Sequence, residues 1–136
     1  MSSEALRKTL ETRMSGGWSA TSVAYENAPF NHPSTEWVRF TIIEGAGETI
    51  GGDGTLVCVR DAGLVSLQIF TPENNGTASA RTLVDTFTAL FEHKRIPDLS
   101  GGRDIKTYSA IKTPVGVNDG WHQTNITIPY RRDRNV

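Results

Sequence analysis

Residues 64–94 read LVSLQIFTPENNGTASARTLVDTFTALFEHK, a strand pattern followed by a helix pattern. Apolar and polar side chains alternate from Leu64 to Phe70, which is typical of a β-strand with one buried face. Pro72 lacks a backbone donor and ends the strand, and Thr77 is a residue type that caps helices. The stretch therefore predicts a sharp corner between a strand and a helix.

The helix predicted from Ala78 to Lys94 has one apolar stripe and an opposite polar face. Basic residues occupy its last turn, where the helix dipole favours cations, and Pro97 follows shortly after. Burying such a stripe is worth about 1.5–3 kcal/mol for each large side chain, so we expect this helix to form part of the core. The stripe consists of Leu83, Val84, Phe87, Leu90 and Phe91.

Upstream, a shorter helix is predicted over residues 3–14, a short strand over 21–27 and a longer strand over 36–44. The segment Gly45–Gly54 comes next and is rich in glycine. Because glycine supplies no side-chain pattern that would fix a strand, we expect a mobile loop here.

Further strands are predicted over residues 55–60 and 64–70, separated by a tight turn at Asp61–Gly63. A last pair is predicted over 104–112 and 121–130, with the turn residues Asn118, Asp119 and Gly120 before the second strand. This order of elements predicts an α+β fold, a mixed, mainly antiparallel sheet with two helices packed on one face. We expect one domain over residues 1–136, with 130–136 as a flexible basic tail.

The composition excludes several classes of protein. The chain has 136 residues, with 14 Lys and Arg against 15 Asp and Glu, so it lacks the excess of positive charge of a strongly basic nucleic-acid binder. The single cysteine, Cys58, excludes an intramolecular disulfide and a multi-cysteine zinc site. No apolar run reaches the roughly 20 residues of a membrane helix, and the first residues do not resemble a signal peptide. We therefore expect synthesis in a reducing cytoplasm.

The sequence offers no catalytic constellation. His32, His93 and His122 lie far apart, without the spacing of a helical zinc site. The glycines from Gly45 to Gly51 miss the dinucleotide-binding spacing by one residue and lead into a strand instead of a helix. Since the carboxylates are also scattered, we expect no enzyme, no metal site and no cofactor, and a structural or interaction role is favoured.

Several short motifs occur in a characteristic order along nearly the whole chain. They are YEN at 25–27, WVR at 37–39, RDAG at 60–63, QIFTPENNGT at 68–77, NDGWHQ at 118–123 and IPYR at 128–131. In this order they resemble the tail terminator-like proteins of long-tailed bacteriophages and prophages.

The resemblance implies an α+β protomer that closes into a ring, typically a homo-hexamer. Such a ring lies on the head-proximal end of the tail tube, stops the polymerisation of the tube protein and presents the surface to which the head-completion protein binds. DNA passes through the ring without sequence-specific binding. The resemblance implies no enzymatic activity and no cofactor, and it implies a location in the virion after assembly in the host cytoplasm.

The candidate assembly contacts follow from the residues themselves. The glycine-rich segment is favoured by elimination, because a long loop in a compact domain commonly binds something. Asn27 is interpreted as a turn residue or as part of a subunit contact, and Trp121 as a core residue or an interface anchor. The basic tail is either solvated or in contact with an acidic surface or with passing nucleic acid. The candidate contact residues are Gly45, Glu48, Ile50, Asp53, Tyr25, Asn27, Trp121, Arg131, Arg132 and Arg134.

Two alternatives stay open at the level of the sequence. The first is another head–tail joining protein or a minor tail protein of similar build. The second is a small ligand-binding domain or enzyme whose site is assembled from residues distant in the sequence. A monomer with a deep pocket and convergent polar groups would favour the second alternative.

Overall fold

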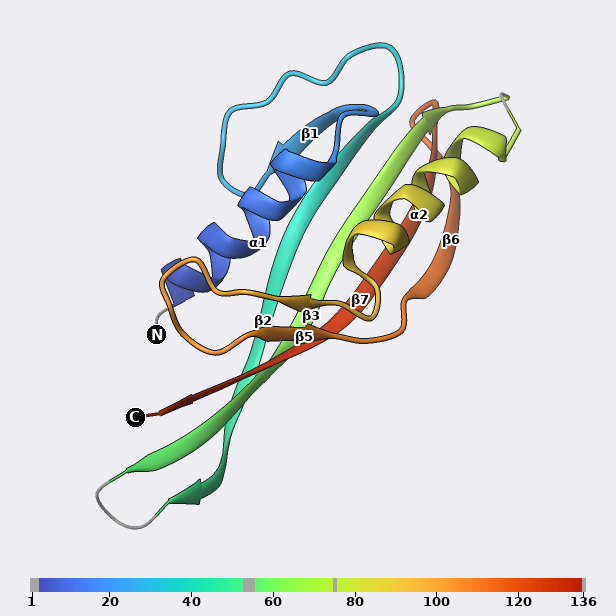
Figure 1. Ribbon diagram of the computed structural model, residues 1–136. Helices are drawn as coiled ribbons and strands as arrows, with labels where there is room; N and C mark the ends of the chain where they lie inside the picture. Colours follow the sequence, from blue (N-terminus) through green and yellow to red (C-terminus); the bar gives the residue numbers. More distant parts are fainter. Residues whose placement is uncertain (1–2, 53–55, 75, 136) are drawn as a thin grey trace.

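The computed structural model describes residues 3–52, 56–74 and 76–135, and these residues form two helices and seven strands (Figure 1). The strands form one curled sheet, and both helices lie over the same face of it. The elements are α1 (Ser3–Gly17), β1 (Ser22–Tyr25), β2 (Trp37–Gly52), β3 (Val57–Pro72), α2 (Ala78–Phe91), β4 (Arg95–Ile96), β5 (Ile105–Thr107), β6 (Ile111–Asn118) and β7 (Trp121–Asn135).

The strands follow the order β1-β2-β3-β7-β5-β4. β1 pairs with β2 in parallel, and every other pairing among the described strands is antiparallel. β5 and β6 share one edge of β7: β6 pairs with residues 121–127 and β5 with residues 130–131. The predicted α+β class, with a mixed, mainly antiparallel sheet and two helices on one face, is confirmed.

The core lies between the helices and the sheet. Leu6, Leu10 and Met14 recur every four residues, and this stripe of α1 is buried. The predicted stripe of α2 is buried as well, apart from the partly exposed Leu90. Alternate side chains of the central strands complete the core, as the period of a half-buried strand requires. Those that are fully buried are Val38, Phe40, Val65, Leu67, Ile69, Ile105, Ile126 and Ile128.

The glycine-rich segment is a strand, so the predicted mobile loop is wrong. β2 continues through Gly45 to Gly52, antiparallel to β3, and Asp61–Gly63 lies inside β3 instead of forming a turn. Residues 53 and 54, the last two of the predicted loop, lie outside the described residues. A strand needs backbone hydrogen bonds and not a side-chain pattern, and here β3 supplies those bonds. Register shifts near Gly47 and Gly51 accommodate the irregular sequence.

The C-terminal residues are also part of the sheet. Residues 130–135, which we expected to form a flexible tail, continue β7 and pair with β3 as far as Cys58. The strand predicted over 104–112 is divided into β5 and the start of β6, which meet β7 at different places. The predicted turn at Asp119 and Gly120 is confirmed, and both residues have positive φ angles.

The helix α2 ends earlier than the predicted Lys94. Glu92 adopts an extended conformation, and the backbone N–H of Lys94 donates to the Thr107 hydroxyl at 2.8 Å, so the chain turns into β4. Thr77 is the residue before the helix, but its side chain forms no capping hydrogen bond. The hydroxyl of Thr77 instead accepts a long hydrogen bond of 3.4 Å from Arg81.

Candidate assembly surfaces

The β2–β3 hairpin projects beyond the helices as an arm (Figure 1). We define the arm as residues 45–52 of β2, 57–62 of β3 and 131–135 of β7. All eight β2 residues of the arm are exposed, and at the usual strand rise they span about 25 Å. The hydrophobic core does not reach this part of the sheet, so cross-strand bonds and ion pairs hold the arm in shape.

Ion pairs lie on both faces of the arm. On the outer face, Arg60 donates two hydrogen bonds to the carboxylate of Asp133, at 2.9 and 3.1 Å. On the face that continues the core, Asp61 accepts a hydrogen bond of 2.6 Å from Arg134 and lies 3.7 Å from Arg132. Both sets join β3 to β7, because these residues are neighbours in the antiparallel register.

These contacts affect proton affinities at the base of the arm. The hydrogen bonds from Arg60 lower the pKa of Asp133 and raise the pKa of the guanidinium. Burial raises the pKa of Tyr130 to about 12, and the nearby Glu44 acts in the same direction. At neutral pH the carboxyl of Asp133 is therefore ionised and paired with Arg60, and the buried Tyr130 is neutral.

The candidate residues from the glycine-rich segment lie along the exposed edge of the arm. Gly45 lies close to the Ala62 carbonyl at a register shift, Glu48 is opposite Arg60, and Ile50 is 42% exposed near the end of β2. Asp53 lies outside the described residues. An apolar side chain on a projecting arm is available for a protein contact.

The three candidate arginines of β7 have different surroundings. Arg131 points to the outer face, with its guanidinium 5.7 Å from the centre of the Tyr108 ring. The Arg132 side chain is buried, only 3% exposed, and Arg134 is held by Asp61. Arg131 and Arg134 are therefore half-buried and partly accessible, whereas Arg132 presents almost no surface to a partner.

Tyr25 and Asn27 line a hollow of about 500 Å³ between α1 and the β1–β2 edge. The Tyr25 ring packs edge-on against Phe40, with 6.1 Å between ring centres, and burial raises the pKa of its hydroxyl. Asn27 is exposed and has a φ of 51°, a conformation that asparagine tolerates in turns. The structure thus brings these two candidates together, apart from the arm.

Trp121 belongs to an aromatic cluster on the outer face of the sheet, outside the helix-covered core. Its ring centre lies 6.3 Å from that of Trp37 and 5.6 Å from that of His32. Trp37 stacks on Phe70 at 4.2 Å and on His32 at 5.4 Å. The cluster fixes the segment between β1 and β2 over this face, so the half-buried Trp121 has a structural role here.

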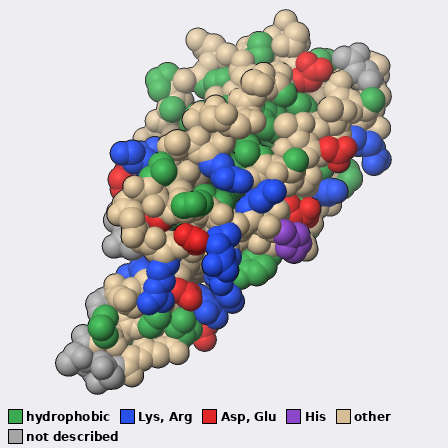
Figure 2. All heavy atoms as spheres, viewed as in Figure 1, with side chains coloured by type: hydrophobic (Ala, Val, Ile, Leu, Met, Phe, Trp, Pro, Cys, Tyr) green, Lys and Arg blue, Asp and Glu red, His purple; other side chains and the backbone are tan. Residues whose placement is uncertain are grey.

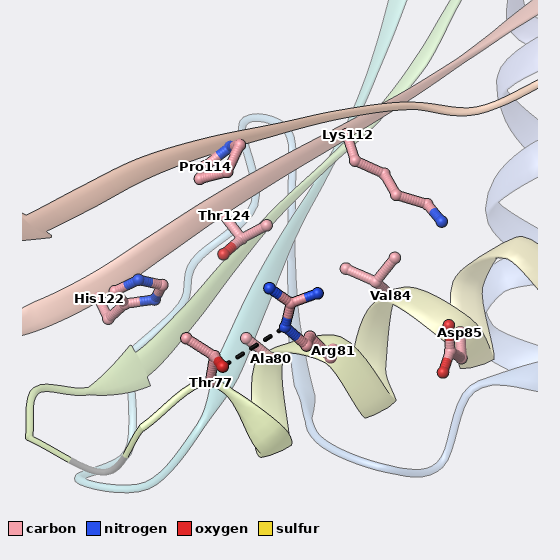
Figure 3. Close-up of a pocket in the computed structure, with 9 residues that line it drawn as sticks. All are labelled: Thr77, Ala80, Arg81, Val84, Asp85, Lys112, Pro114, His122 and Thr124. Carbon is pink, nitrogen blue, oxygen red and sulfur yellow. Dashed lines mark hydrogen bonds between the residues drawn. The ribbon is translucent and has the colours of Figure 1, made fainter.

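A groove of about 300 Å³ runs between α2 and the inner side of β6 and β7 (Figure 3). Val84 and Ala80 form part of its floor, and Lys112 and His122 lie on the opposite wall. Beside it, the edge strand β6 exposes Ile111, Val115 and Val117 at 52–60%. The strand predicted over 104–112 does not include Val115 and Val117, although β-branched residues in a short segment are a strand signal.

The described residues contain no group of three or more histidine, cysteine or acidic side chains that could hold a metal ion. None of the helices in the described ranges is long and apolar enough to cross a membrane. His122 does lie on the face shared by Ile126 and Ile128, as its position in the strand predicts. The charged or ionisable side chains of the groove are Arg81, Asp85, Lys112 and His122, and among the described contacts no hydrogen bond joins any two of these four.

Fold and surfaces together define an α+β protein whose most distinctive feature is a projecting, partly apolar arm. The chain matches the phage tail terminator protein family over residues 3–130 and belongs to that family. It is therefore a structural protein of the phage tail. No curated protein matches it significantly. A solved structure with 21% sequence identity superposes with a TM-score of 0.76, covering 96% of this chain and 95% of the other, and this likeness supports the fold alone.

Proposed function

We propose that this protein is the ring-forming tail terminator that caps the tail tube, stops its polymerisation and presents the surface to which the head joins. Membership of the tail terminator family supports the general role. The observation that supports the capping mechanism is the arm, which extends beyond the core and exposes every residue from 45 to 52.

Each added ring of tube protein exposes the same face as the ring before it, so growth stops only when a different ring covers that face. A projecting hairpin can reach across such a junction, because its strand edges offer backbone hydrogen bonds and its side chains offer apolar contacts. Gly45, Glu48 and Ile50 lie on the exposed part of the arm and are the proposed tube contacts.

The remaining partners in this proposal are those that the resemblance to tail terminators implies. Copies of the chain form the ring, as a homo-hexamer in the assembled tail, and DNA passes through the ring without sequence-specific binding. The head-completion protein binds the face opposite the tube. The protein lies at the head-proximal end of the virion tail, and assembly takes place in the host cytoplasm. This role requires no catalysis and no cofactor.

The test is deletion of the gene from the phage or prophage, followed by electron microscopy of the particles. The proposal predicts overlong tails that are not joined to heads, because tube nucleation continues while length control is lost. Tails of normal length joined to full heads would contradict the proposal. Short tails, or no tails, would favour a minor tail protein that acts earlier in assembly.

A further inference from the structure

Three basic side chains lie directly opposite one another on neighbouring strands. Arg95 of β4 pairs with Lys106 of β5, and Lys106 pairs with Arg131 of β7. All three point to the outer face, since the residues beside them, including Ile96 and Ile105, are buried in the core. We call these three residues the cation row. Like charges in direct cross-strand register repel one another and destabilise a sheet, so the row has a cost in the isolated chain.

Carboxylates within the molecule neutralise the cation row only weakly. Asp104 lies 4.0 Å from Arg95, and Asp133 is already held by two hydrogen bonds from Arg60. Among the described residues, none places a carboxylate within 4.0 Å of the Lys106 ammonium. Arg103 adds a further cation to the same hollow of about 280 Å³. Figure 2 shows Lys and Arg side chains gathered over the base of the arm.

The surface next to the cation row is open to a partner. Ala62 of β3 is the neighbour of Arg131 in the sheet, and Gly45 of β2 lies beyond Ala62, so these two neighbours on the β3 side of the row have small side chains. The Arg131 guanidinium rests against the Tyr108 ring, which fixes its plane. A planar, fixed guanidinium is suited to bidentate binding of a carboxylate.

Carboxylates gather at the other end of the strand order, in the hollow between α1 and the β1–β2 edge. Glu11, Glu26 and Glu44 line it, and we call these three residues the carboxylate set. The lining also contains Arg7, whose guanidinium is already bound by Glu4 and Glu11. Glu26 and Glu44 are exposed, and each is oriented by one hydrogen bond, from the Ile42 backbone at 2.9 Å and from the Ser3 hydroxyl at 2.6 Å.

We infer that the cation row of one copy binds the carboxylate set of the next copy, and this inference rests on the proposed ring. A ring needs a heterologous contact, in which two different patches of the same chain meet. Among the described residues, the cation row and the carboxylate set lie toward opposite ends of the strand order. Tyr25 and Asn27, which line the hollow of the carboxylate set, then become part of the same subunit contact.

The test is a charge-swap experiment in a phage that lacks its own copy of the gene. One variant carries Arg95→Glu and Lys106→Glu, a second carries Glu26→Lys and Glu44→Lys, and a third carries all four changes. Each of the first two should lower the yield of joined particles by about tenfold or more, because close charge pairs across an interface are strongly coupled. The four-fold variant should recover most of the yield. Lys94→Glu, an exposed charge outside the hollow, is the matched control and should have no effect.

Two further measurements make the outcome decisive. Thermal unfolding of each purified variant checks that the chain still folds. In purified wild-type tails, carbodiimide cross-linking should join Lys106 of one copy to Glu26 or Glu44 of another.

Full yield from the first variant would overturn the inference, and so would an absence of rescue by the four-fold variant when that variant is folded. If the first variant gives tails of normal form through which DNA does not pass, the cation row contacts DNA and not a neighbouring copy, and this result would also overturn the inference. If the deletion itself leaves tail length unchanged, the proposed function fails instead.

Discussion

Phe87 is the side chain at which both helices and the sheet meet. It is fully buried, and its ring centre lies 5.0 Å from that of Phe91, 6.4 Å from that of Phe40 and 6.4 Å from that of Trp18. These partners come from α2, from β2 and from the residue that follows α1. Edge-to-face and tilted aromatic contacts add to the free energy of apolar burial, so this residue connects all the layers of the core.

The substitution Phe87→Ala should lower the free energy of unfolding by about 3–5 kcal/mol, because it removes buried area and leaves a cavity. Chemical denaturation of the purified protein measures this change. Asp85→Ala, at an exposed position of the same helix, is the matched control and should change the free energy by no more than about 0.5 kcal/mol. Equal denaturation midpoints for wild type and Phe87→Ala would show that Phe87 is not a buried residue of the core.

The pair Arg60–Asp133 predicts a pH dependence with a definite sign. The pKa of Asp133 is lowered in the folded chain, so its ion pair contributes stability above the pKa of the unfolded carboxyl. That contribution is lost as the pH falls through the lower, folded pKa. Asp133→Asn should therefore unfold more easily than wild type at pH 6, and the difference should vanish in acid. A difference that is constant from pH 6 to pH 2 would show that the charge of Asp133 is irrelevant.

At the scale of elements, the arm depends on two glycines at its base, Gly63 and Gly45, where the backbones of β2 and β3 lie very close together. A Cβ atom on Gly63 would collide with the Ile43 carbonyl oxygen and would lie 2.6 Å from the Tyr130 hydroxyl. A Cβ atom on Gly45 would collide with the carbonyl oxygen of Ala62. β2, β3 and β7 can therefore come together at the base of the arm only with glycine at these positions.

Gly63→Ala should destabilise the protein by about 1–3 kcal/mol, since the backbone and a buried ring would have to shift. Gly51→Ala is the control within the same arm. It has no atom within 4 Å of the added Cβ, and it should be neutral or slightly stabilising. Thermal unfolding of the two variants measures the contrast. If the two substitutions change the unfolding temperature equally, the close backbone approach at Gly63 is contradicted.

The elements that the sequence could predict are those with a local pattern. The stripe from Leu83 to Phe91 and the alternation from Leu64 to Phe70 are complete within a few residues, so α2 and the middle of β3 were predictable. The outer half of the hairpin was not, because its order comes from pairing with a distant strand. Arg134 and Asp61 are 73 residues apart, and no local pattern reveals that they bind each other.

The candidate assembly surfaces were likewise predictable only where they depend on a local sequence pattern. The exposure of residues 45–52 was predictable, because they lack the alternation of apolar and polar side chains that a buried strand shows. Their conformation was not, because they form a strand and not a loop. Whether a residue of β7 is buried depends on long-range packing, which is why Arg132 and Arg131 could not be told apart. The cation row could not be predicted, because it forms only when β4, β5 and β7 pair in this register. No local sequence pattern indicates which residues of these strands are paired.

At the scale of the whole molecule, the contact surfaces lie at different places on one curled sheet. The arm extends at one end, and the groove between α2 and β6 lies toward the other (Figure 1). The cation row and the carboxylate set belong to opposite ends of the strand order. A protomer with separate patches for neighbours and for the tube can close into a ring and still contact a second kind of ring.

The central claim is that the arm makes the contact that stops the tube. The most direct test replaces residues 49–59 by an Asn-Gly turn, which keeps Glu48 opposite Arg60 and shortens the hairpin. The purified variant should unfold with a midpoint close to that of wild type, because the core is intact. In phage that carry only this variant, electron microscopy should show tails as overlong as those of the deletion. Tails of wild-type length, joined to heads, would contradict the claim.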